Sequence, residues 1–118
     1  MNYRTTLKTT RLNAVITDIG ASGELIIGTS GMATVLATIS LADPAGTVSG
    51  DTLTFTMPQS DASADAGGTP LEAIITDGSS TIIDGISVGV SASDIIIDAA
   101  TVTAGQEFKV SSGTIVHA

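Results

Sequence analysis

Serine and threonine are numerous in this 118-residue sequence, but the sequence contains few residues that could activate their hydroxyl groups as nucleophiles. A serine or threonine nucleophile needs a general base within hydrogen-bonding distance, and histidine usually supplies it. The sequence contains no cysteine, which excludes disulfides and thiolate chemistry, and one histidine, His117, next to the last residue. Because chain ends are commonly frayed and solvated, we expect His117 to close the last strand and to take no part in catalysis.

Aspartates offer a second kind of chemistry, acid–base catalysis or cation binding. Asp94 and Asp98 flank an apolar stretch and lie on the same side of an extended strand, as the paired carboxylates of a glycosidase do. Together with Asp77 and Asp84 they could also gather at one end of a β fold and hold calcium. No D-x-D-x-D-G loop and no aromatic platform for a sugar accompanies them, and the glycines match no phosphate-binding loop. We therefore expect solvated turn aspartates, a protein that is not an enzyme, and no catalytic, cofactor or metal site.

Charge is distributed unevenly along the chain. Three of the four basic residues, Arg4, Lys8 and Arg11, lie near the start of the chain. All twelve acidic residues come after them, together with the fourth basic residue, Lys109, and the net charge of the chain is −8. Such an acidic body repels the phosphates of nucleic acids, so we expect no nucleic-acid partner. We predict that the three basic residues and Tyr3 contact an acidic protein partner; the alternative is a solvated helix face.

The N-terminal segment contains the one predicted helix. Apolar residues recur at spacings of three and four from Leu12 to Ile19, which favours a helix over residues 10–19 that ends at Gly20. The four threonines before it are poor helix formers, so we expect the first turns to be extended or frayed. We predict that residues 1–23 form an N-terminal arm or helix whose first eleven residues can be removed without loss of the fold.

The remainder, residues 24–118, is predicted to form a single domain of short strands separated by turns. Leu53, Phe55 and Met57 alternate with threonines, and this period of two is typical of a strand with one buried face. The predicted strands span residues 34–41, 52–57, 71–76, 81–90, 95–97, 100–103, 107–110 and 114–116. Their length and spacing predict an all-β fold, an antiparallel β-sandwich or barrel of jelly-roll or immunoglobulin-like type. The small, polar segment 59–69 is expected to be an exposed and mobile loop.

The apolar residues are too dispersed for a membrane-spanning helix. No stretch approaches the roughly 18 consecutive apolar residues that such a helix needs. Polar residues interrupt the segment that follows the basic start, unlike the apolar core of a signal peptide. We expect a soluble protein with no membrane partner.

Several motifs together resemble a known group of proteins. The chain starts with Y-x-x-x-L-K-T-x-R and continues with L-x-I-G-T-x-G-M-A-x-V-L-A-T-I-x-L-x-D-P over Leu25–Pro44. S-D-x-S-A-D-A-x-G-T follows over Ser60–Thr69, and T-A-G-Q over Thr103–Gln106. The whole resembles small virion structural proteins of tailed bacteriophages, over nearly the full chain.

This resemblance implies a structural role, that of a capsid decoration (cement) protein on the outside of a shell of major capsid protein. It implies a virion location after assembly in the host cytoplasm, and a homo-oligomer, either dimer or trimer. Two alternatives remain open at this point: a head-fibre, neck or tail component of the virion with residues 59–69 facing outward, and a carbohydrate-binding or adhesin-like β module. The shortage of aromatic residues argues against the latter.

Overall fold

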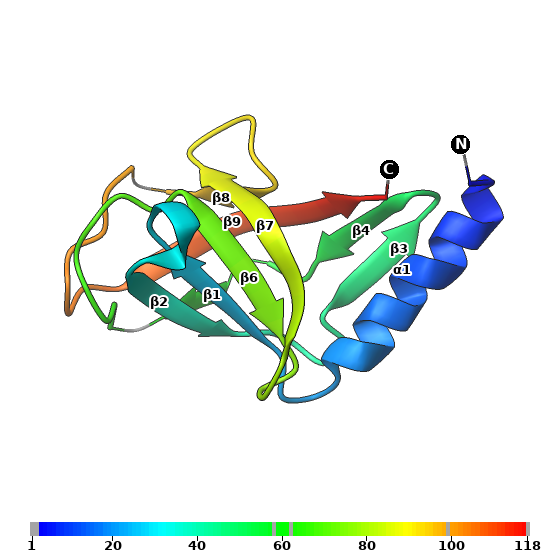
Figure 1. The fold of residues 1–118 in the computed structure, drawn as a ribbon, viewed down its shortest axis with the longest axis horizontal. Helices are drawn as coiled ribbons and strands as arrows, with labels where there is room; N and C mark the ends of the chain where they lie inside the picture. The colour runs from blue at the N-terminus through cyan, green and yellow to red at the C-terminus, as the bar shows by residue number, and fades with distance from the viewer. Residues whose placement is uncertain (1–2, 58, 62, 99, 118) are drawn as a thin grey trace.

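The chain folds into one N-terminal helix followed by strands (Figure 1). The computed structural model describes residues 3–57, 59–61, 63–98 and 100–117. Helix α1 spans Thr5–Ile19, and a short 3-10 helix, η1, spans Ser30–Met32. The strands are β1 (Glu24–Gly28), β2 (Val35–Ser40), β3 (Gly46–Ser49), β4 (Thr52–Phe55), β5 (Gln59–Asp61), β6 (Glu72–Thr76), β7 (Thr81–Gly89), β8 (Ile95–Ile97) and β9 (Phe108–Val116).

The strands form a curled, mixed sheet shaped as a half-barrel. Their order is β2-β1-β6-β7-β8-β9-β4-β3, and β5 pairs with the first part of β9. The prediction of a β-rich chain with one short N-terminal helix is confirmed. The prediction of a purely antiparallel sheet is wrong, because β7 and β8 run parallel at Val88 and Gly89, and a sandwich or jelly roll is not confirmed.

The parallel pair arises from a short loop that brings the chain back beside itself. The Ser87 hydroxyl accepts a hydrogen bond from the Asp94 N–H at 2.9 Å, and the Ser87 N–H donates to the Asp94 carboxylate at 3.4 Å. Ala92 adopts a positive φ of 52° within this loop. These local bonds set β8 in the same direction as β7, which alternation of apolar residues does not reveal.

Helix α1 begins five residues before its predicted start. Threonine hydroxyls in its first half bond back to the chain: Thr9 to the carbonyl of Thr5 and Thr10 to that of Thr6, both at 3.1 Å. This satisfies polar groups that would otherwise compete with the helix. The helix ends at Gly20, whose φ of 65° suits glycine and whose N–H bonds the Ile16 carbonyl.

Several strand boundaries differ from the predicted ones. Strands β1, β3 and β5 were not among the predictions, and the two predicted strands 107–110 and 114–116 are one strand, β9. Residues 100–103 do not form the predicted strand; Val102 makes only an isolated bridge with Gly68.

The core lies inside the curl of the sheet and continues under α1. Its fully enclosed side chains include Leu25 and Ile27 of β1, Leu36 and Ile39 of β2, Leu53, Ile75, Ile95 and Val110. From α1, Leu12 and Ile19 add to the same cluster. Burial of this apolar surface is the main stabilising contribution, at roughly 25 cal/mol per Å².

The segment 59–61 and 63–69 matches the exposed loop expected from composition only in part. It begins with β5, and Ala64 is buried, with only 4 % of its surface exposed. The Asp61 carboxylate accepts a hydrogen bond from the Thr38 N–H of β2 at 3.1 Å, and the Asp65 N–H donates to the Leu36 carbonyl at 2.8 Å. The segment thus connects β5 to the outer edge of β2.

We expect Asp61→Ala to lower the free energy of unfolding by about 1–3 kcal/mol, because it leaves the half-buried Thr38 N–H without its acceptor. Asp65→Ala is the matched control: it removes an exposed carboxylate four residues away and keeps the backbone bond to Leu36. Urea denaturation followed by circular dichroism measures both. Equal stability of the two variants would show that the Asp61 carboxylate does not hold β5 to β2.

Candidate functional site

The predicted contact residues lie on one flank of α1. Arg4 is the N-cap residue, and Lys8 and Arg11 follow at spacings of four and three, which places them side by side along the helix. Arg4 and Arg11 are exposed and Lys8 is half-buried. Within the described part of the chain, no carboxylate pairs with any of the three. The structure therefore brings the basic residues together as a stripe, which we call the basic flank.

Tyr3 and Arg11 contact each other at the start of this flank. The guanidinium carbon of Arg11 lies 4.7 Å from the centre of the Tyr3 ring, a cation–π arrangement. The Tyr3 ring meets the ring of His117 edge-on, with centres 5.5 Å apart. Stacking restricts the Arg11 side chain but leaves its in-plane N–H groups able to donate to a carboxylate. The start of α1 and the end of β9 accordingly lie at the same end of the molecule (Figure 1).

The basic flank belongs to a helix that packs on the core. Leu12 is buried, with 3 % of its surface exposed, and α1 contacts β3, β4 and β7. The Thr9 hydroxyl donates a hydrogen bond to the carbonyl of Gly50 in the turn between β3 and β4. Deleting residues 1–11 would remove about half of α1 and the hydrogen bond from Thr9 to Gly50, so we expect that deletion to destabilise the fold.

The positions of the charged residues in α1 do not stabilise the helix. A helix favours acidic groups in its first turn and basic groups in its last turn, by about 0.3–1 kcal/mol each. In α1 the first turn has no acidic residue, the last turn has no basic residue, and the N-cap Arg4 makes no capping hydrogen bond. Asp18, which is acidic, stands in the last turn instead. Departures from local stability of this kind are expected where a surface serves function.

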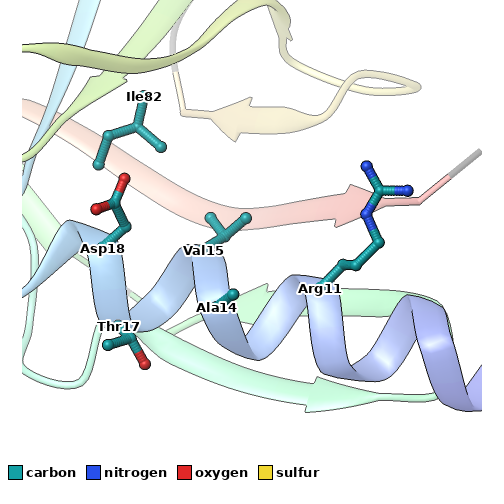
Figure 2. A pocket seen from close by; sticks show the side chains of 6 residues that line it. All are labelled: Arg11, Ala14, Val15, Thr17, Asp18 and Ile82. Carbon is teal, nitrogen blue, oxygen red and sulfur yellow. The ribbon is translucent and has the colours of Figure 1, made fainter.

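A groove continues the basic flank toward the other end of α1 (Figure 2). It has a volume of about 590 Å³ and is lined by Arg11, Ala14, Val15, Thr17 and Asp18 of the helix and Ile82 of β7. Val15 and Asp18 point from the helix toward Ile82, whereas Thr17 points away. Val15 and Ile82 are both half-buried and pack against the core. The groove thus offers an apolar floor between a cation and a carboxylate.

The sequence did not point to this groove directly. The spacing of Arg4, Lys8 and Arg11 continues to Val15 and Asp18, so the helical face was available from the sequence. Ile82 comes from a strand 67 residues after Val15 in the numbering, and only the topology places it opposite the helix.

The turn aspartates are engaged separately from one another. Asp94 bonds Ser87, the Asp98 carboxylate accepts a hydrogen bond from the Ser111 hydroxyl, and Asp84 is exposed on β7. The N–H groups of Ser80 and Ser79 donate to the Asp77 carboxylate at 2.8 and 2.9 Å, and they lower its pKa below the ordinary value. Among the residues that the structure describes, no three metal-ligating side chains gather into a group.

Among the residues that the structure describes, no helix combines the length and the apolar character needed to cross a lipid bilayer.

Comparison with known proteins gives no relative: no family model matches the chain, and neither a curated protein nor a solved structure matches it. Function is therefore inferred from the chain's own residues and geometry.

Proposed function

We propose that this protein is a non-enzymatic structural component of a phage virion, a capsid decoration protein that binds and stabilises the shell of major capsid protein. In this proposal the basic flank of α1 docks on an acidic region of the shell. The protein is located on the outer surface of the capsid and is assembled there in the host cytoplasm.

The observation that carries the proposal is the reversed charge pattern of α1. Arg4 and Lys8 lie at the start of the helix, where cations oppose the helix dipole, and Arg11 follows in the second turn. The described residues supply no ion pair to compensate the three cations. The chain after Arg11 carries all twelve acidic residues. A cationic stripe on an otherwise acidic molecule attracts an acidic partner in one orientation, which is what electrostatic complementarity contributes to docking.

The fixed position of the basic flank on the domain also supports the proposal that it is a docking surface. Leu12 and Ile19 anchor α1 in the core, and the Tyr3 ring restrains Arg11. A docking surface fixed before binding loses less conformational freedom when the complex forms. Copies of the chain are proposed to join as a dimer or trimer.

The proposal is tested by mixing the purified protein with undecorated shells of the phage that encodes it. We expect saturable co-sedimentation at a fixed ratio to the major capsid protein, measured by gel densitometry, and a higher melting temperature of the decorated shells. Failure to co-sediment would contradict the proposal. Saturation at a few copies per particle would instead favour a neck, tail or head-fibre component.

A further inference from the structure

We propose that the segment bound by α1 is an extended stretch of the partner protein that carries alternating acidic side chains followed by one bulky apolar side chain. The acidic side chains pair with Arg4, Lys8 and Arg11, and the apolar side chain enters the groove between Val15 and Ile82. This inference rests on the proposed function, since it takes the basic flank as the docking surface.

The spacing of the flank fits an extended segment. With a rise of about 1.5 Å per residue, helix positions three or four apart are separated by roughly 4.5–6 Å along the axis. Side chains on one face of an extended strand recur about every 6.6 Å. The helix positions of Arg4, Lys8, Arg11 and Val15 therefore recur at nearly the repeat of alternate residues in a strand.

The groove supplies the apolar part of the recognition. The groove is wide open to solvent and has a volume of about 590 Å³, so a side chain can enter it from the surface. Val15 and Ile82 stand on opposite walls and are packed against the core, so the site does not have to form on binding. An apolar side chain placed between them would shield both from water.

The polar ends of the groove define the charge pattern of the occupant. Arg11 belongs both to the basic flank and to the groove lining, so the last acidic residue of the segment and the apolar residue are neighbours on the same face. Asp18 at the other end disfavours a further acidic residue beyond the apolar one.

The test uses a labelled peptide in which three aspartates alternate with serines and are followed, two positions later, by a leucine. Fluorescence anisotropy measures its binding to the full chain, and both chain directions of the peptide are made. We expect saturable binding that weakens when sodium chloride is raised, and about tenfold weaker binding when the leucine is replaced by serine, because one buried apolar side chain is lost. This comparison leaves the protein unaltered.

Variants of the chain complete the test. Val15→Ser with Ile82→Ser should bind the leucine and serine peptides equally, whereas Val90→Ser, which changes an exposed apolar residue in the loop after β7, should still prefer the leucine peptide. Equal binding of the two peptides to the unaltered protein, or no binding at millimolar concentration, would overturn the inference. So would a dimer in sedimentation velocity that the groove variant converts to a monomer, since the occupant would then be a second copy.

Shell binding separates this inference from the proposed function. If the groove variant is folded and decorates shells as the unaltered protein does, the groove is not used and the decoration proposal stands. If the unaltered protein does not bind shells, the decoration proposal fails, whatever the peptide result.

Discussion

Replacing Arg4, Lys8 and Arg11 together with glutamine is expected to weaken attachment of the protein to capsid shells about 100-fold without destabilising its fold. Each exposed ion pair contributes up to about 1 kcal/mol, so the loss of three amounts to roughly two orders of magnitude in affinity. The same change removes two cations, those of Arg4 and Lys8, from the start of α1, where they oppose the helix dipole. We therefore expect the melting temperature to stay the same or to rise by a few degrees.

Co-sedimentation with shells and differential scanning fluorimetry measure these two effects. Lys109→Gln is the matched control, because Lys109 is an exposed cation on β9 and lies outside the basic flank. Its binding should remain within about twofold of that of the unaltered protein. If each removed charge lowered the affinity for shells equally in the control and in the triple variant, only net charge would matter and α1 would not be the docking element.

Leu12→Ala is expected to lower the free energy of unfolding by about 2–4 kcal/mol, the range for a buried leucine that leaves a cavity. Leu12 has 3 % of its surface exposed and joins α1 to the core, so its loss also loosens the element that carries the basic flank. In a domain of this size the melting temperature should fall by roughly 10 °C.

Leu7→Ala provides the comparison for Leu12→Ala within the same helix. Leu7 has 42 % of its surface exposed, and its truncation should change stability by no more than about 0.5 kcal/mol. Thermal and urea unfolding of the two variants give the difference. If both variants were as stable as the unaltered protein, α1 would not be docked on the core, and the basic flank would lie on a mobile arm after all.

Periodicity predicted those strands that have one buried and one exposed face. Leu53 and Phe55 of β4 alternate with exposed or half-buried threonines, as expected from the sequence. The sequence of strand β1 lacks this alternation because it contains the continuous apolar run from Leu25 to Ile27, although Leu25 and Ile27 are buried and Ile26 between them is half-buried. A run without a period of two does not distinguish a strand from other buried segments.

Hydrogen bonds between polar side chains and the backbone of other segments could not be predicted from the sequence. The Asp61 carboxylate makes an ordered segment of what composition describes as a flexible loop, because it accepts a hydrogen bond from Thr38, 23 residues away. The Ser87–Asp94 bonds similarly turn an expected antiparallel neighbour into a parallel one. In both cases a short polar side chain substitutes for a backbone partner, and no repeat in the sequence signals it.

Part of the candidate site could be predicted from the sequence, and part of it could not. The basic flank could be predicted, since Arg4, Lys8 and Arg11 are spaced as one face of a helix. Its rigidity could not, because it depends on contacts of Tyr3 with Arg11 and His117 and on the burial of Leu12. The groove requires Ile82, which the fold brings from β7.

Cryo-electron microscopy of shells decorated in vitro with this protein tests the central claim most directly. The account predicts density for the β domain on the outer surface, with α1 turned toward the shell and carboxylates of the major capsid protein within ion-pairing distance of Arg4, Lys8 and Arg11. Density in which α1 faces solvent while another part of the sheet contacts the shell would contradict it.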